Sequence, residues 1–160
     1  MQIYPPEQYQ QQLQSLFDTY LQQIQTLLPQ ARVEHIGSSA IPGAWSRADL
    51  DILLCVPEQA FDQTIQLLKR LHFREKVATS KRSELCILEA INTQEDVEIY
   101  LVAENSYLLN FIDFRDILRG QPKLVDAYNN LKKSSQDLNE DEYRNRKTQF
   151  IESVLQQYLT

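Results

Sequence analysis

Two carboxylates stand two residues apart in the stretch "ADLDILLCV", where Asp49 and Asp51 enter an otherwise apolar run. In a β-strand, residues i and i+2 point to the same face, so this spacing predicts that both carboxylates converge on one side of a sheet. Two like charges repel unless something positive lies between them. Hard carboxylate oxygens suit Mg²⁺, which keeps part of its water shell and binds one or two protein carboxylates together with substrate phosphates. The pair therefore predicts a site for Mg²⁺ or another divalent cation such as Mn²⁺.

A third acid, Glu98, lies in the apolar run "DVEIYLVA". If this run forms a strand beside the one that carries Asp51, the three carboxylates share one catalytic and metal-binding site. Such a cluster suits in-line transfer at phosphorus, because the metal neutralises phosphate charge and an acid positions or deprotonates the attacking hydroxyl. The alternatives are ordinary ones: Asp49 as a solvent-exposed residue at a strand end, and Glu98 as an exposed strand residue.

A glycine-serine turn precedes the acids in "HIGSSAIPG", which contains two of the three glycines of the chain, Gly37 and Gly43. A glycine after a strand lets the backbone approach a ligand closely, and successive N–H groups there form an anion-binding concavity. The hydroxyl of Ser38 can donate to a phosphate oxygen, and Ser39 follows it. Gly-Ser turns are common, so the prediction of a phosphate-binding turn at Gly37, Ser38 and Ser39 depends on the acids that follow.

Cationic side chains that can contact phosphate occur on both sides of the acids. Arg47 precedes the acidic pair, and Arg115 and Lys132 lie on predicted helices that can face it. A guanidinium binds phosphate in a bidentate way that a lysine cannot. The alternative is a solvated face with structural ion pairs, for which Asp113 and Asp116 lie next to Arg115. Lys81 and Arg82 are alternative phosphate contacts, and further basic residues of the C-terminal helices are Arg119 and Lys147.

Other residues that often carry chemistry have ordinary explanations here. His35 is expected to be a packed or hydrogen-bonded strand residue. Cys55 and Cys86 lie in apolar runs and are expected to be buried free thiols of a cytoplasmic protein, with a disulfide or metal pair as the alternative. The sequence has no His/Cys set with zinc spacing and no readable Ser-His-Asp arrangement.

The elements that must position these residues follow from hydrophobic periodicity. Apolar residues at helical spacing predict helices over 6–28 and 58–73. Short apolar runs bounded by glycine, proline or polar turns predict strands. The expected strands are 31–37, 48–56, 83–91 and 96–103, the last two joined by the hairpin-like "NTQED", and the expected C-terminal helices are 106–119, 122–134 and 140–158.

These elements indicate an α+β chain of α/β-like character, with a small mixed β-sheet, a crossover helix and a group of C-terminal helices. The 160 residues suit one hydrophobic core, and no linker is long enough to separate two domains. A single domain over 1–160 is expected, with a core at about 1–104 and a helical part at about 105–160.

The composition narrows the classes of partner. The formal net charge of −6 argues against a nucleic-acid partner, although it leaves room for a local basic pocket. No apolar run approaches the roughly 18–20 residues of a membrane span, and "MQIYPPEQYQQQLQ" lacks the basic start and apolar core of a signal peptide. A cytoplasmic protein without a membrane partner is expected, and a homo-oligomer stays open.

The Gly-Ser turn followed by Asp-x-Asp resembles the signature of the nucleotidyltransferase superfamily, whose polymerase-beta-like core uses two or three strand acids to hold divalent metal. More specifically, "VEHIGSSAIPG" with "DILLCV" resembles the GrpB family, also called UPF0157, whose members carry V-E-H-I-G-S-T-x-V-P-G. The stretches "FRDILRGQPKLVDAYNNLKK" and "YRNRKTQFIESVL" are similar to the C-terminal half of that family, so the resemblance covers about residues 31–158. It implies a nucleotidyltransferase-like core, and the family is similar to a domain fused to dephospho-CoA kinase in some bacteria.

This chain departs from the family pattern at two places. The family usually has Lys-Pro where this chain has Arg47-Ala48, and often an apolar residue at the position of Asp49. A His-x-His strand of the family appears here as Glu98-Ile99-Tyr100, whereas Asp51 matches a near-invariant position. The fuller set of carboxylates favours the metal interpretation and puts in doubt any role of the family's histidines here.

The function that these residues predict best is Mg²⁺-dependent transfer of a nucleoside monophosphate from a nucleoside triphosphate to a small acceptor. One alternative is a non-catalytic module that binds a nucleotide or a phosphorylated metabolite. Another is an interaction protein in a two-component complex. The sequence does not give the acceptor, the base preference or the pathway.

Overall fold

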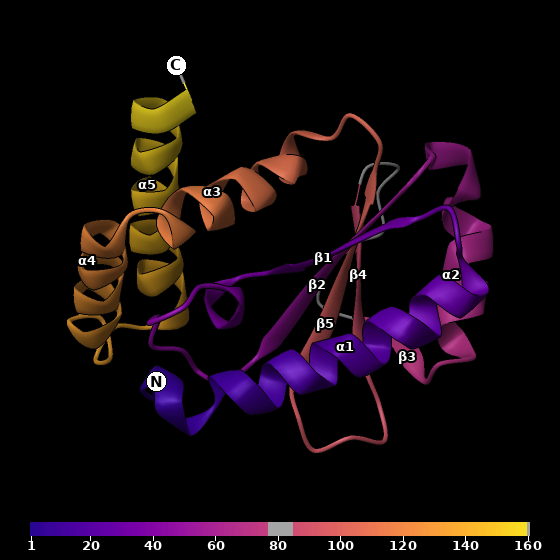
Figure 1. Cartoon of the computed structure of the whole chain (residues 1–160), viewed down its shortest axis with the longest axis horizontal. Helices are drawn as coiled ribbons and strands as arrows, with labels where there is room; N and C mark the ends of the chain where they lie inside the picture. The colour runs from indigo at the N-terminus through magenta and orange to yellow at the C-terminus, as the bar shows by residue number, and fades with distance from the viewer. Residues whose placement is uncertain (77–84, 160) are drawn as a thin grey trace.

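A mixed sheet of five strands forms the centre of the computed structural model, which describes residues 1–76 and 85–159 (Figure 1). The strand order is β1-β2-β5-β4-β3, and β2 pairs with β5 in parallel while the other neighbouring strands are antiparallel. The sheet is therefore mixed, as the sequence predicts. The strands are β1 (Arg32–Ile36), β2 (Leu50–Val56), β3 (Phe73–Glu75), β4 (Leu85–Ala90) and β5 (Val97–Ala103).

Helices flank the sheet and occupy most of the C-terminal region (Figure 1). The expected helix 6–28 is divided by Tyr9 into a short 3₁₀ turn and a long α-helix. The α-helices are α1 (Gln10–Leu27), α2 (Phe61–Lys69), α3 (Asn110–Arg119), α4 (Pro122–Lys133) and α5 (Glu140–Leu159), and the 3₁₀ turns are η1 (Pro6–Gln8), η2 (Ser38–Ala40), η3 (Glu58–Ala60) and η4 (Tyr107–Leu109).

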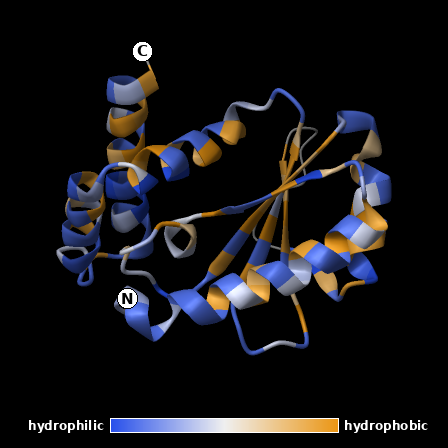
Figure 2. Cartoon of the chain, viewed as in Figure 1, coloured by the Kyte–Doolittle hydropathy of each residue, from blue (hydrophilic) through white to orange (hydrophobic). Residues whose placement is uncertain are grey.

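The two faces of the sheet pack against different helices. On the first face, alternate residues of β2 such as Leu50 and Ile52 pack against apolar residues of α1 and α2. On the second face, Leu53 and Cys55 form a smaller cluster with Ile112 of α3. Figure 2 shows the same division, with hydrophobic residues along the strands and polar residues on the outer side of α1. Because side chains alternate along a strand, the odd-numbered side of β2 turns toward the C-terminal helices.

The C-terminal helices share a buried cluster with the segment that follows η2. Ile41 and Ala44 are fully buried and pack among Phe114, Tyr128 and Val154. The side-chain amide of Asn129 donates to the Gly43 carbonyl oxygen at 3.0 Å. The turn between β1 and β2 therefore attaches the sheet to α3, α4 and α5, which explains how acids from the sheet and cations from the helices reach one place.

The structure differs from the predicted elements mainly in one short strand. β3 was not expected, and its first residue, Phe73, was predicted as the end of the helix 58–73, which in the structure consists of η3 and α2 and ends at Lys69. The three residues of β3 carry too little pattern to indicate a strand, and pairing with β4 supplies the stabilising contacts. Cys55 and Cys86 are buried and free, as predicted. Lys81 and Arg82, proposed above as phosphate contacts, lie outside the described residues. Within the described parts of the chain, no helix is long and apolar enough to cross a membrane.

Candidate functional site

A cleft of about 910 Å³ lies between the second face of the sheet and the C-terminal helices. The sheet and the segments joined to it contribute five of the predicted site residues, and α4 and α5 contribute aromatic and basic side chains. Its principal polar lining residues are Gly37, Arg47, Asp49, Asp51, Lys76, Glu98, Tyr100, Tyr128, Tyr143 and Lys147.

Asp51 lies at the floor of this cleft with a carboxylate oxygen that has no partner. It stands opposite Ile36 of β1 and Glu98 of β5 in the strand register. Its Oδ1 atom is buried and accepts no hydrogen bond from the described residues. Burial, followed by the charge of Asp49, raises the pKa of Asp51 to about 7. The ionised form of a buried carboxylate that lacks a hydrogen bond is stabilised by any cation that reaches it.

Gly37 is required beside Asp51 for two separate reasons. Its φ of +77° lies in the left-handed region, which residues with a Cβ atom rarely adopt. A Cβ atom added to Gly37 would lie 2.6 Å from Asp51 Oδ2, closer than any ordinary contact. The glycine predicted from the sequence as a point of close approach therefore makes room for the carboxylate of Asp51.

Asp49 is held by a tight turn immediately before β2. The Ser46 hydroxyl donates to Asp49 Oδ1 at 3.4 Å and accepts from the Ala48 N–H at 3.0 Å. Ala48 has a φ of +67°, a left-handed conformation that is strained for a residue with a Cβ atom. The turn places Asp49 on the cleft together with Asp51, as their spacing predicts.

Glu98 also lines the cleft, but it is already bound by a cation of the chain. The Lys76 ammonium donates to Glu98 Oε2 at 2.7 Å. The predicted pairing of the two strands is confirmed, since Asp51 and Glu98 are register partners. Within residues 1–76 and 85–159, however, no group of three or more His, Cys, Asp or Glu side chains is arranged to hold a metal ion. The three expected acids therefore share the cleft without forming a three-ligand metal set.

Ser38 and Lys132, both predicted phosphate contacts, meet although 94 positions separate them. The Lys132 ammonium donates to the Ser38 hydroxyl and to the Trp45 carbonyl oxygen, the latter at 2.6 Å, and lies 3.8 Å from the centre of the Tyr128 ring. Burial, followed by the charge of Lys147, lowers the pKa of Lys132 well below its usual range. Lys132 is only 2% exposed, so its first role is to fix the turn that carries Ser38.

Arg47, which was predicted to contact phosphate, lines the cleft. Its guanidinium donates to Glu140 Oε1 at 3.0 Å and lies 6.0 Å from the centre of the Tyr143 ring. Its side chain is 41% exposed, so this ion pair is screened by solvent. A ligand phosphate can compete for the guanidinium without breaking a buried contact.

Lys147 of α5 is the site residue that sequence reasoning did not select. It is partly buried on the wall of the cleft. Tyr128 is the main cause of a raised pKa for its ammonium, and Tyr143 and Asp51 add to it. Among the described residues, no carboxylate lies within ion-pairing distance of it. In the sequence, Lys147 is one of several basic residues on the C-terminal helices. Only the packing of α5 against the sheet shows that this lysine, rather than another, lines the cleft.

Four predicted phosphate contacts do not line the cleft: Ser38 and Lys132, which bond to each other, and Ser39 and Arg115. The Ser39 hydroxyl is buried 2.9 Å from His35 Nε2 and does not line the cleft. Arg115, only 7% exposed, donates to Glu34 Oε1 at 2.7 Å and pairs with Asp116 at 2.9 Å. The expected phosphate role of Arg115 is thus replaced by the ion-pair alternative. The reason is that its helix crosses β1, which presents an acid and a backbone carbonyl at that point.

His35 is a packed strand residue, as predicted. Its ring stacks on Phe17 at 4.8 Å between centroids, and burial followed by the charges of Arg119 and Arg115 lowers its pKa to about 4. A neutral ring bonded to Ser39 explains why the second serine of the turn is not available to a ligand.

The residues around Asp51 fit a divalent cation. The donors are hard carboxylates, one buried oxygen accepts no hydrogen bond from the described residues, and burial with the charge of Asp49 raises the pKa of Asp51, which are conditions that a bound Mg²⁺ relieves. Asp49 and Asp51 are the two residues that would hold such a cation, which would neutralise phosphate charge there.

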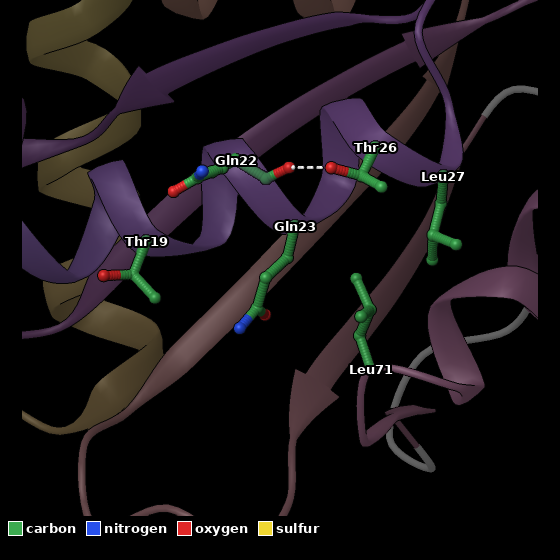
Figure 3. A pocket seen from close by; sticks show the side chains of 6 residues that line it. All are labelled: Thr19, Gln22, Gln23, Thr26, Leu27 and Leu71. Atoms are coloured by element: carbon green, nitrogen blue, oxygen red, sulfur yellow. Dashed lines mark hydrogen bonds between the residues drawn. The ribbon is translucent and has the colours of Figure 1, made fainter.

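A second hollow, shown in Figure 3, lies between α1 and the end of α2. It is smaller, about 320 Å³, and its lining consists of neutral side chains. Because it presents neither a titratable group nor a cation, it has nothing with which to hold a metal or a phosphate. The lining residues are Thr19, Gln22, Gln23, Thr26, Leu27 and Leu71.

Relatives of known sequence match along most of the chain. The sequence model described as GrpB protein matches residues 7–157. A UPF0157 protein of Vibrio cholerae serotype O1 is 44% identical over 157 residues, which cover 98% of this chain and 83% of that protein. A UPF0157 protein of Deinococcus radiodurans is 29% identical over 142 residues, which cover 88% of this chain and 74% of that protein.

Solved structures match the fold as well. The crystal structure of GrpB from Enterococcus faecalis has a TM-score of 0.80 at 20% identity and covers 99% of this chain and 100% of its own. A cytoplasmic RNA terminal U-transferase has a TM-score of 0.54 at 19% identity, over 73% of this chain and 36% of its own. Cid1 poly(U) polymerase with Mg and 3′-dATP has a TM-score of 0.53 at 17% identity, over 72% and 36%. At these identities the likeness shows a nucleotidyltransferase-like fold.

Proposed function

The chain belongs to the GrpB family, and from that premise we propose that it transfers a nucleoside monophosphate from a nucleoside triphosphate to a small acceptor, with the help of Mg²⁺ or a similar cation. The observation that carries this proposal is the buried Oδ1 of Asp51, to which none of the described residues donates a hydrogen bond, beside Asp49 in a cleft that also presents the ammonium of Lys147. Carboxylates and cations in one cleft suit a metal-bound polyphosphate.

The reaction assigns a role to each part of the cleft. Asp49 and Asp51 would hold the divalent cation, which when bound lowers the negative charge of the phosphates. Arg47 and Lys147 would bind phosphate oxygens, and Gly37 with Ser38, fixed by Lys132, would form the turn beside them. An acceptor oxygen would attack the α-phosphorus as the bond to pyrophosphate breaks, and Glu98 would receive the acceptor proton.

A small acceptor is favoured over RNA by the charge of the molecule. The solved neighbours named above include a poly(U) polymerase and an RNA terminal U-transferase. The match covers only 36% of their length, and the net charge of −6 of this chain argues against a broad nucleic-acid surface. We further propose a single domain in a cytoplasmic location, which the two buried free thiols support.

Two other functions remain distinct proposals. A non-catalytic nucleotide-binding module would use the same cleft without turnover. An interaction protein in a two-component complex would need an exposed apolar face on the C-terminal helices. Among the described residues, three of the four large exposed apolar side chains belong to the C-terminal part, Tyr107 in η4 and Tyr158 with Leu159 in the last turn of α5, and the fourth is Met1. We prefer the binding cleft because its acids and cations have a chemistry that an apolar face does not need.

Thermal stabilisation by each nucleoside triphosphate, with and without Mg²⁺, tests the proposal. We expect a rise in melting temperature that needs both the triphosphate and the cation and that disappears in Asp51→Asn. Equal stabilisation of Asp51→Asn and wild type would contradict the metal site. Release of pyrophosphate when a pool of small hydroxyl compounds is added would distinguish the enzyme from a binding module.

A further inference from the structure

The ion pair between Lys76 and Glu98 extends across a strand. Lys76 continues β3 along β4, since its backbone N–H donates to the Ile87 carbonyl oxygen at 2.9 Å. Glu98 is on β5, and β4 lies between β3 and β5 in the sheet. The lysine side chain therefore reaches over β4, on the face that lines the cleft, to bond with Glu98 Oε2 at 2.7 Å.

This contact occupies the acid that would otherwise be nearest to Asp51 on the neighbouring strand. Asp51 and Glu98 are register partners on adjacent parallel strands, a placement that brings side chains together on one face. Yet the acids of residues 1–76 and 85–159 do not form a three-ligand metal set. One oxygen of Glu98 is directed to the Lys76 ammonium instead.

We propose that Lys76 is a positioning residue that keeps Glu98 out of the metal coordination, so that the chain binds one divalent cation, on Asp49 and Asp51, rather than two. This inference rests on the proposed function, because it concerns the cation of that same site. The Lys76 ammonium takes the place of a second cation at Glu98 and leaves one oxygen of that acid available to an acceptor.

The charges agree with a single cation. One divalent ion together with one ammonium balances the three carboxylates of Asp49, Asp51 and Glu98. Without the ammonium, a single divalent ion leaves these three acids with one negative charge that it does not balance, which favours a second ion beside Glu98. The pair is partly exposed, with 37% of the Lys76 and 22% of the Glu98 side chain accessible, so removing Lys76 leaves no cavity in the core.

The same strand offers a matched control. Arg74 pairs with Glu89 at 2.8 Å, again between β3 and β4, and Glu89 also lines the cleft. Arg74→Met removes one positive charge from β3, as Lys76→Met does, but it leaves Glu98 bound. A general effect of net charge would change both variants equally, whereas the proposal concerns Lys76 alone.

The experiment is a titration of the full chain with Mn²⁺ alone, followed by calorimetry and by the paramagnetic resonance signal of free Mn²⁺. We expect one bound ion in wild type and in Arg74→Met, two in Lys76→Met, and one again in Lys76→Met combined with Glu98→Gln. Circular dichroism melting curves of all variants verify that each is folded.

Two ions in the wild type, or one in a folded Lys76→Met, would overturn the inference while leaving the metal site standing. No bound ion in the wild type would instead contradict the proposed metal site, and the inference with it. If Lys76→Met does not fold, Glu98→Gln decides. We expect it to keep one ion with an affinity within about fivefold of wild type, because the ion is held by Asp49 and Asp51 and not by Glu98, whereas a complete loss of binding would make Glu98 a ligand.

Discussion

At the scale of single residues, Asp51 has a buried carboxylate oxygen without a partner, an arrangement that destabilises the metal-free protein. Asp51→Asn keeps the shape and removes the charge. We expect the free energy of unfolding in EDTA at pH 8 to rise by about 1–3 kcal/mol, while stabilisation by Mg²⁺ is lost. Urea denaturation measures both effects. Asp126→Asn, an exposed change on α4, is the control and should alter neither.

The same carboxyl predicts how stability depends on pH. Because the pKa of Asp51 in the folded chain is raised to about 7, the folded state keeps a proton that the unfolded state releases near pH 4. The contribution of Asp51 to stability therefore falls as pH rises from about 4 to 7. The advantage of Asp51→Asn over wild type in EDTA should grow between pH 5 and pH 8, as followed by urea denaturation. An advantage that shrinks over this interval would contradict the assignment.

His35 acts in the opposite direction and explains why the comparison with Asp51→Asn is needed. Its pKa of about 4 in the folded chain lies below the ordinary value, so the unfolded state takes up a proton first as pH falls. The stability contributed by the neutral ring is present above pH 6.5 and is lost as pH falls toward 4. The wild-type curve alone combines both residues, whereas the difference between the two chains isolates Asp51.

At the scale of elements, the turn from β1 into η2 depends on Gly37. In Gly37→Ala the new Cβ atom lies 2.6 Å from Asp51 Oδ2, and the alanine must adopt a φ of +77°. We expect a loss of about 1–2 kcal/mol in unfolding free energy from the backbone alone, and a loss of Mg²⁺-dependent stabilisation as the carboxylate moves. Gly120→Ala is the control, because its nearest atom lies at 3.8 Å. Equal behaviour of the two variants in thermal melts would refute this role.

The attachment of α3 to β1 depends on Arg115. Arg115→Lys loses the bidentate geometry that joins Asp116, Glu34 and the His35 carbonyl oxygen. We expect the unfolding free energy to fall by about 1–3 kcal/mol while nucleotide affinity stays unchanged. Denaturant unfolding and a nucleotide titration separate the two, with exposed Arg70→Lys as control. Weaker nucleotide binding at unchanged stability would restore the phosphate role that the structure argues against.

At the scale of the whole molecule, the cleft joins the sheet to the C-terminal helices, so a ligand in it should stabilise both. With Mg²⁺ and a triphosphate, we expect amide exchange to slow in β2 and in α5 together. Lys147→Met should weaken nucleotide binding by about tenfold to a hundredfold and remove the protection of α5, because an unpaired ammonium on that helix is lost. Lys123→Met, exposed on α4, should bind as wild type does.

The sequence alone determined the features that depend on short spacing. The apolar periodicity indicated the helices and four of the strands, and the mixed sheet followed from their order. The i, i+2 spacing predicted that Asp49 and Asp51 share one side, and both line the cleft. Gly37 was predicted as a point of close approach to a ligand, whereas the group that closely approaches it in the structure is the Asp51 carboxylate. These properties are local, because strand alternation and backbone freedom are set by neighbours in the chain.

Only the tertiary structure decided which distant side chains meet. Arg115 and Lys147 are both basic residues of C-terminal helices. Because α3 crosses β1, Arg115 forms an ion pair with Glu34, whereas the packing of α5 places Lys147 on the cleft. The bond from Lys76 to Glu98 depends on β3, whose three residues carry no readable pattern and which is held by pairing with β4. Such contacts result from the packing of whole elements, and no spacing within one element encodes them.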